Sequence, residues 1–177
     1  MIRLFAAIAI PPDIGEGLLQ RQLGIEGARW RPPEAFHITL KFFGDVREDA
    51  ADDLDGALST VTGEPLDLSL EGVGAFGEGP DIHAVWAGVA ENLALRRLAA
   101  RCESAARRAG LKGEARAYRP HVTLAYLTRP DPASVAMWIQ ENNLLKSPAF
   151  RATTFGLYSS RLGHNGSVYR LERGYPL

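Results

Sequence analysis

The chain has 177 residues, a hydrophobic fraction of 46% and a formal net charge of −1 at pH 7. This length suits one domain that buries roughly two thirds of the surface its unfolded chain would expose, and the composition is ordinary for a globular protein. The charge argues against a protein that coats long nucleic acid, DNA included, because such binders gain affinity by neutralising many phosphates. It leaves room for a site that binds one or two phosphates.

No run of residues approaches the roughly 18 uninterrupted apolar positions of a membrane span. The apolar opening Ile2–Ile10 contains Arg3 and ends at Pro11-Pro12, so it predicts a first strand and not a signal peptide. We therefore expect a cytoplasmic protein that does not contact the membrane. The single cysteine, Cys102, excludes an internal disulfide and a multi-cysteine metal site, and its helical surroundings predict a buried structural thiol.

Hydrophobic periodicity predicts strands and helices that mix without strict alternation, which indicates an α+β fold. Strand-like runs occupy residues 3–10, 36–43, 66–73, 82–89, 121–127 and 149–160. Apolar residues at helical spacing occupy residues 11–23, 47–61, 92–109 and 131–139. The glycine-rich segment 72–80 is expected to turn the chain, and Gly163-His164-Asn165-Gly166 to close a C-terminal hairpin.

Two of the predicted strands repeat one pattern. They read His37-Ile38-Thr39-Leu40-Lys41-Phe42-Phe43 and His121-Val122-Thr123-Leu124-Ala125-Tyr126-Leu127. Because side chains alternate along a strand, each histidine shares a face with the threonine two residues later, and the apolar residues between them face a core. If the halves are related by a pseudo-two-fold axis, both motifs face one cleft. A single His-x-Thr is weak support for function, but two matching copies favour a functional site.

The paired motifs suit an in-line displacement at a phosphodiester. One imidazole takes a proton from the attacking water and the other gives a proton to the departing oxygen, since the imidazole pKa of about 6.5 allows both forms near neutrality. The hydroxyls of Thr39 and Thr123 can donate to the non-bridging phosphate oxygens. We expect no metal and no cofactor, because a zinc site would need a third ligand on these strands.

At these residues the chain resembles the 2H phosphoesterase superfamily, and within it the RNA 2′,3′-cyclic phosphodiesterases, historically called 2′-5′ RNA ligases. The likeness extends to the flanking segments 3–7, 30–34, 40–44, 119–120 and 157–160. It implies a single bilobal domain over residues 1–177, with two pseudo-symmetric halves of antiparallel sheet and helices around a central cleft. Each lobe would carry one motif, at 37–39 and at 121–123.

The resemblance also implies metal-independent hydrolysis of 2′,3′-cyclic phosphates, at RNA ends or in small cyclic nucleotides, to 2′-phosphates. Carried over by motif, His37 is the proton donor, His121 is the proton acceptor, and Thr39 and Thr123 bind the phosphate; the two histidine roles are interchangeable. Three alternatives stay open: 2′-5′ RNA ligation by the reverse reaction, non-catalytic binding of phosphorylated RNA ends, and metal-dependent hydrolysis. We expect a monomer.

Relatives often carry an arginine five residues after the second histidine, where this chain has Tyr126. A guanidinium binds phosphate through two hydrogen bonds, whereas a phenol donates one and carries no charge. Arg129, Arg119 and Lys41 are candidate substitutes, and none of them stands out. Lys41 is an even number of residues after His37 and so is expected on the same face of the strand. Its side chain is equally expected to face the cleft or open solvent.

Phe42 and Tyr126 occupy matching positions in the two motifs. Core packing is expected for them, with stacking on a nucleobase as the alternative. Of the remaining histidines, His83 is expected to be structural and His164 to be exposed in the predicted hairpin turn.

Overall fold

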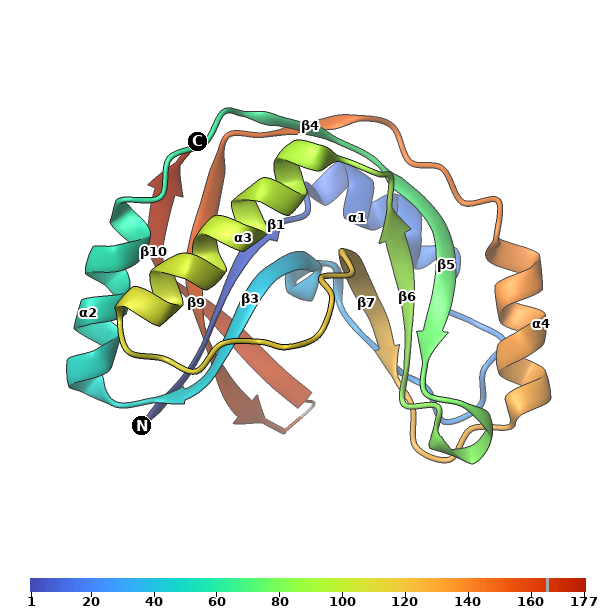
Figure 1. Ribbon diagram of the computed structural model, residues 1–177. Coiled ribbons are helices and arrows are strands. Elements are labelled where there is room, and N and C mark those ends of the chain that lie inside the picture. Colours follow the sequence, from blue (N-terminus) through green and yellow to red (C-terminus); the bar gives the residue numbers. More distant parts are fainter. Residues whose placement is uncertain (165) are drawn as a thin grey trace.

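The structure, a computed structural model, describes residues 1–164 and 166–177, which form two large antiparallel sheets with helices on them (Figure 1). The first sheet has the order β10-β9-β1-β3, with strands β1 (Ile2–Ala9), β3 (His37–Val46), β9 (Thr154–Gly163) and β10 (Gly166–Pro176). The second has the order β2-β7-β6-β5, with strands β2 (Arg29–Trp30), β5 (Leu70–Phe76), β6 (Ala84–Val89) and β7 (His121–Tyr126). Short strands β4 (Leu66–Leu68) and β8 (Phe150–Ala152) pair with each other and link the two lobes. The predicted α+β fold is confirmed.

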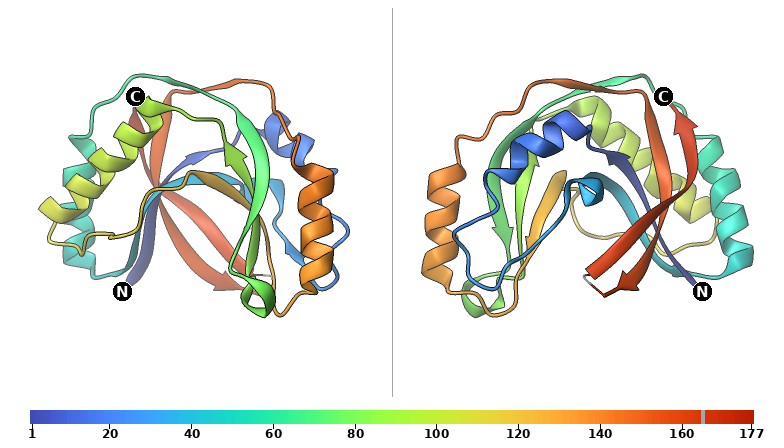
Figure 2. Two further views of the ribbon diagram at one scale, coloured as in Figure 1. Left: turned by 45° about the vertical axis from the view of Figure 1, so that its right-hand side comes forward. Right: turned by 180° about the vertical axis from the view of Figure 1, so that it is seen from behind.

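Two helices lie on each sheet. Helices α2 (Glu48–Ser59) and α3 (Leu93–Arg108) pack together against the first sheet, and α1 (Pro12–Leu19) and α4 (Pro132–Asn142) lie on the second (Figures 1 and 2). Two 3-10 turns, η1 (Pro33–Ala35) and η2 (Gly79–Asp81), precede β3 and β6. In the part of the chain that the structure describes, no helix has both the length and the apolar character to cross a bilayer.

The order of elements repeats along the chain. The series β1-α1-β3-α2-β4-β5 matches β6-α3-β7-α4-β8-β9, with β2, β10 and the 3-10 turns as additions. Strand β1 pairs with β3 and β9, and its counterpart β6 pairs with β7 and β5. Each half of the chain therefore contributes its last strand and its first helix to the lobe built mainly from the other half. As a result, β3 and β7 hold equivalent places in the two sheets.

The glycine-rich segment 72–80 turns the chain only in its second half, at Gly77 and through η2, because β5 continues through residues 72–76. Its pairing with β6 is irregular between Leu70 and Val73, where Gly72 has a φ of +71°. A Cβ atom on Gly74 would lie 2.4 Å from the Trp86 ring, so glycine is needed there for close packing and not for a turn. The predicted C-terminal hairpin is present as β9 and β10, while Asn165 of its predicted turn lies outside the described residues.

One ion pair ties the first motif strand to α3. Lys41 Nζ lies 2.7 Å from Glu103 Oε2, and both side chains are largely buried. Glu103 Oε1 also accepts hydrogen bonds from Arg107 Nε at 2.9 Å and from the Glu114 amide at 3.0 Å. Burial alone would raise the pKa of Glu103, but the bonds from Lys41, Arg107 and the Glu114 amide lower this pKa to about 2.

We predict that Glu103→Gln lowers the free energy of unfolding by about 1–3 kcal/mol at neutral pH, because it leaves the Lys41 ammonium buried without a carboxylate. The folded-state pKa of Glu103 lies below the value of about 4.3 for an unfolded glutamate, so its contribution is complete above about pH 4.3 and is lost as the pH falls toward 2. Urea unfolding should therefore show a smaller difference from wild type at about pH 3.5 than at pH 7.

Glu91→Gln is the matched control, because Glu91 forms an exposed pair with Arg96 at the other end of α3. Its effect should be much smaller than that of Glu103→Gln, because solvent screens an exposed ion pair. If both substitutions change the free energy of unfolding equally, the buried Lys41–Glu103 pair stabilises the fold no more than an exposed pair does.

Candidate active site

His37 and His121 begin β3 and β7, and the backbone holds their rings in the same way. His37 Nδ1 lies 2.8 Å from the carbonyl oxygen of Ala35, and His121 Nδ1 lies 2.7 Å from that of Arg119. In both cases the carbonyl belongs to the residue two positions earlier. Because a carbonyl can only accept a hydrogen bond, each Nδ1 carries a proton, and Nε2 is the nitrogen available for proton transfer.

Each motif strand contains a β-bulge at the leucine that follows the threonine. Ala7 pairs with Thr39 and Ala6 pairs with Lys41, which leaves Leu40 without an opposing residue. In β7 the partners of Trp86 and Val85 are Thr123 and Ala125, which leaves Leu124 unopposed. An extra residue shifts the alternation of side chains by one position. From histidine onward, both strands consequently read half-buried, buried, half-buried, buried, buried, exposed.

Because of the bulges, three side chains lie on other faces than the sequence predicts. Lys41 does not share the face of His37, because it follows the bulge: its side chain is buried and its ammonium contacts Glu103. The expectation that Phe42 and Tyr126 pack in the core is also wrong. Their exposed fractions are 48% and 37%, and the bulge returns both rings to the face of the histidine and threonine of their strand.

Aromatic rings surround both imidazoles. The His37 ring centroid lies 4.9 Å from that of Phe5 and 5.0 Å from that of Tyr169. The His121 ring centroid lies 4.8 Å from that of Phe76 and 6.1 Å from that of Trp86. These rings exclude water from part of each imidazole, which disfavours the charged form.

Burial is the main cause of the low histidine pKa values. It lowers the pKa of His37 to about 4, against the opposing effect of the Ala35 carbonyl, and the charges of His121 and Arg31 add to the decrease. Burial also lowers the pKa of His121, again opposed by a carbonyl and assisted by the charge of Arg119. Both imidazoles are therefore neutral at pH 7 in the free protein, and they lie close enough for the charge of one to affect the other.

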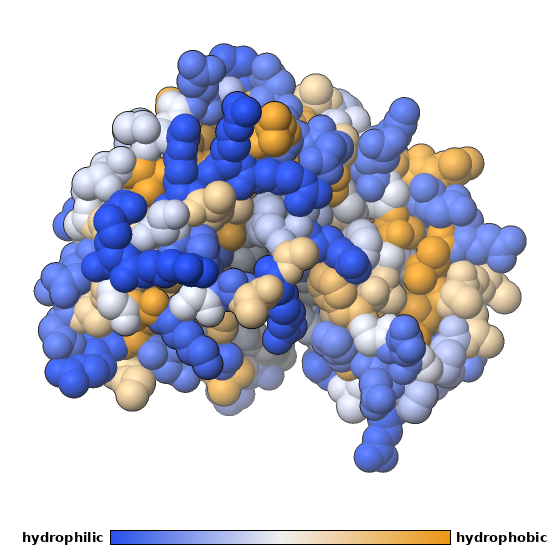
Figure 3. All heavy atoms as spheres, in the orientation of Figure 1, coloured by the Kyte–Doolittle hydropathy of each residue, from blue (hydrophilic) through white to orange (hydrophobic). Residues whose placement is uncertain are grey.

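A cavity of about 780 Å³ runs along the free edge of β3 and beneath residues 114–119. Thr39 and His121 both line it, together with Phe42, Phe76 and His83 from the facing strands and turns. The Tyr118 hydroxyl donates to the Thr39 carbonyl at 3.0 Å and so holds the covering segment against β3. Figure 3 shows the molecule hollowed between its lobes, with hydrophilic side chains over α3 and its following segment.

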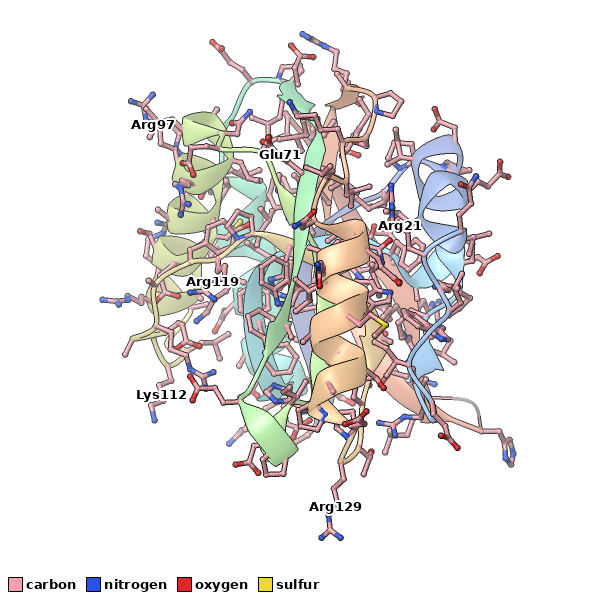
Figure 4. All side chains as sticks on the ribbon, turned by 90° about the vertical axis from the view of Figure 1, so that its right-hand side faces the viewer. Arg21, Glu71, Arg97, Lys112, Arg119 and Arg129 are labelled. Atoms are coloured by element: carbon pink, nitrogen blue, oxygen red, sulfur yellow. The ribbon has the colours of Figure 1, made fainter. Side chains whose placement is uncertain are left out.

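The candidate substrate-binding cations have different positions. Arg119 lines the cavity, whereas Arg129 lies beyond the end of β7 with a φ of +45°, and Figure 4 shows its side chain pointing away from the protein. Arg129 is therefore not brought to the site, whereas Lys41 is among the residues that line the cavity, with its ammonium on Glu103. His83, expected to be structural, lines the cavity and is exposed, with Nδ1 3.1 Å from the Asp81 carbonyl oxygen. His164 is exposed, as predicted.

Sequence reasoning missed Arg31, which it included only within the flanking segment 30–34 before the first motif. The Arg31 side chain is buried, with 6% exposed, and its Cζ lies 5.8 Å from the Tyr126 ring centroid and 5.4 Å from that of Tyr169. No local pattern marks this residue, because the contacts that define its position come from β7 and β10. Among the described residues, no group of three or more His, Cys, Asp or Glu side chains is arranged to hold a metal ion.

Known proteins resemble this chain over nearly its whole length. A protein described as RNA 2′,3′-cyclic phosphodiesterase from Archaeoglobus fulgidus is 31% identical over 172 residues, covering 96% of this chain and 97% of the relative. One of the same description from Methanocaldococcus jannaschii is 29% identical over 173 residues, covering 96% and 98%.

Solved structures share the fold. Escherichia coli LigT complexed with 3′-AMP has a TM-score of 0.80 at 24% identity, and TT0787 of Thermus thermophilus has a TM-score of 0.81 at 22% identity. Each comparison covers 99% of this chain and 98% of the other. The family model described as the 2′-5′ RNA ligase superfamily matches residues 19–164. With this match over most of its length and its likeness to the Archaeoglobus protein, the chain belongs to the 2′-5′ RNA ligase superfamily, a group of 2H phosphoesterases.

Proposed function

We propose that this protein hydrolyses the 2′,3′-cyclic phosphate of RNA ends to a 2′-phosphate, without a metal, through general acid and base catalysis by His37 and His121. The observation that carries the proposal is the equivalence of the two imidazoles. Each has Nδ1 on a backbone carbonyl and a threonine on its own face of the strand. The relatives named RNA 2′,3′-cyclic phosphodiesterase support the choice of substrate.

In the proposed reaction, water attacks the phosphorus atom while His121 Nε2 takes its proton. The bond between phosphorus and the ribose 3′ oxygen breaks in line with this attack, and His37 Nε2 gives a proton to the departing oxygen. The product carries a 2′-phosphate and a 3′-hydroxyl, and His121 ends protonated while His37 ends neutral. A proton exchange with solvent restores the starting state.

For this reaction His37 must be charged, although its pKa in the free protein is about 4. The anionic phosphate favours the imidazolium form once it is bound, as does the Ala35 carbonyl that accepts from Nδ1. Thr39 and Thr123 are proposed to donate hydrogen bonds to the non-bridging oxygens. The exposed rings of Phe42 and Tyr126, on the same strand faces, would stack on bases or on the ribose.

The reverse reaction, 2′-5′ ligation, ranks second because water at its normal concentration favours hydrolysis of a cyclic phosphate. A cytoplasmic location and a monomeric state remain predictions.

We predict that a 2′,3′-cyclic phosphate oligonucleotide yields the 2′-phosphate product, with or without a 5′-hydroxyl partner strand and in the presence of a chelator. His37→Ala and His121→Ala should each lower turnover by roughly 10²–10⁴-fold, because each removes a proton-transfer group. Chromatography of the products measures both effects. His164→Ala is the matched control and should keep wild-type turnover, since His164 is exposed in the turn after β9.

Three results would contradict this prediction in different ways. Joined strands as the main product would favour ligation, and loss of turnover with the chelator would favour a metal-dependent reaction. Binding of the oligonucleotide without turnover would favour a non-catalytic protein.

We predict that Thr39→Val and Thr123→Val each lower kcat/KM by roughly 10- to 150-fold, which corresponds to about 1.5–3 kcal/mol for a lost hydrogen bond to a charged group. Valine keeps the shape and the branching of threonine, so the fold should be retained. Steady-state kinetics with thermal unfolding as a control tests this. An unchanged kcat/KM in both variants would show that the Thr39 and Thr123 hydroxyls do not bind the phosphate.

We predict a bell-shaped pH profile of kcat/KM with its maximum below pH 6.5. This parameter reports the free protein, in which burial lowers the pKa of both histidines. The charged form of His37 is lost as the pH rises through about 4, and neutral His121 persists below the usual imidazole pKa. The maximum of kcat should lie at higher pH, because bound phosphate raises both pKa values. Coinciding maxima, or a profile without a maximum, would be inconsistent with this assignment.

A further inference from the structure

The proposed site lacks an arginine on β7, where Tyr126 stands five residues after His121. Of the three cations considered as substitutes, Lys41 is bound to Glu103, Arg129 points away, and Arg119 is an exposed side chain in the segment over the cavity. The buried guanidinium of Arg31 is a fourth cation, and it contacts the Tyr126 ring itself.

Backbone contacts fix Arg31 to the second lobe. It directly follows β2, and its amide donates at 2.8 Å to the carbonyl of Leu124, the bulged residue of β7. The carbonyl oxygen of Arg31 accepts a hydrogen bond from Gln22 Nε2 at 2.7 Å. The bulge at Leu124 that turns Tyr126 toward the cleft therefore also fixes the backbone position of Arg31.

The guanidinium reaches from this lobe to the other. Arg31 Nη2 donates to the Ser167 carbonyl of β10 at 2.7 Å. The β9–β10 hairpin extends from the first sheet toward the second (Figure 2), which brings Ser167 and Tyr169 to this point. A Cβ atom on Gly166 would lie 2.9 Å from Arg31 Nη1, so a glycine at the start of β10 leaves space for the cation.

Tyr169 connects the cation to the first histidine. Its ring contacts the His37 ring, with centroids 5.0 Å apart, and lies 5.4 Å from Arg31 Cζ. The charge of Arg31 also lowers the pKa of His37, after the larger effect of burial. The guanidinium thus lies between Tyr169, which packs against His37, and Tyr126 of the second motif strand.

We propose that Arg31 is a phosphate-binding residue of this site, and that its guanidinium, held between Tyr126 and Tyr169, supplies positive charge to the bound phosphate. A guanidinium has five N–H donors, and Ser167 uses one, so the group can anchor itself and still donate to phosphate oxygens. Packing on two phenol rings holds its plane in one orientation. The inference rests on the proposed function for the identity of the substrate, but phosphate binding can be measured without turnover.

The test compares Arg31→Gln with Arg29→Gln. Arg29 is an exposed arginine of the preceding strand β2, and its side chain donates to Thr128 instead of contacting Tyr126 and Tyr169. Titration calorimetry with inorganic phosphate should show affinity about 10- to 100-fold weaker in Arg31→Gln and unchanged in Arg29→Gln, because a charge-assisted hydrogen bond is lost only in the first. NMR titration should show a higher pKa for His37 in Arg31→Gln, since a neighbouring positive charge is gone.

A double variant separates charge from structure. Tyr126→Arg added to Arg31→Gln returns a guanidinium to the same space from β7, and it should recover at least tenfold in phosphate affinity. A residue that only held the hairpin through Ser167 would not be replaced in this way. If Arg31→Gln does not fold, Arg31→Lys takes its place: it keeps the charge without the planar fork, and several-fold weaker phosphate binding is expected.

Wild-type phosphate affinity in a folded Arg31→Gln or Arg31→Lys protein would overturn the inference, as would failure of the double variant to recover binding. These outcomes differ from failure of the proposed function. In that case the wild type would not hydrolyse the cyclic phosphate, yet its phosphate affinity would still depend on Arg31.

Discussion

An unopposed leucine in each motif strand determines which side chains reach the cleft. A regular strand starting at His37 or His121 would turn its fifth residue toward the cleft and its sixth toward the core. The bulges at Leu40 and Leu124 reverse this order. Phe42 and Tyr126 therefore join the histidine and threonine, and the carbonyl of Leu124 becomes the anchor for Arg31. The composition of the cleft depends on these two irregularities of backbone pairing.

The two lobes are alike in backbone and differ in the side chains around their histidines. Each places a histidine on the carbonyl two residues earlier and each has the same pattern of burial along its motif strand. The exchange of strands and helices between the halves makes these environments equivalent in geometry. Phe5 and Tyr169 pack on His37, and Arg31 contacts the Tyr169 ring, whereas Phe76 and Trp86 surround His121. A symmetric framework thus presents two imidazoles with unequal surroundings, as a reaction with one acid and one base needs.

Long-range contacts also distinguish the two buried cations, Lys41 and Arg31. Lys41 and Glu103 form an ion pair that joins the edge strand β3 to α3, so this lysine stabilises the fold. Arg31 joins β2 to the hairpin β9–β10, across the space between the lobes. Its aromatic neighbours Tyr126 and Tyr169 come from strands of both lobes, so the Tyr126 ring is one of two surfaces on which the guanidinium lies.

The sequence by itself determined the α+β class, the repeated strands and the shared face of each histidine and threonine, because these follow from local periodicity over three or four residues. It could not reveal a bulge, since an extra residue is defined only by the strand that pairs with it; Lys41, Phe42 and Tyr126 were assigned to the wrong faces for that reason. Arg31 depends on tertiary structure even more. Its position is decided by Leu124, Tyr126, Ser167 and Tyr169, which only the folded chain brings around one guanidinium.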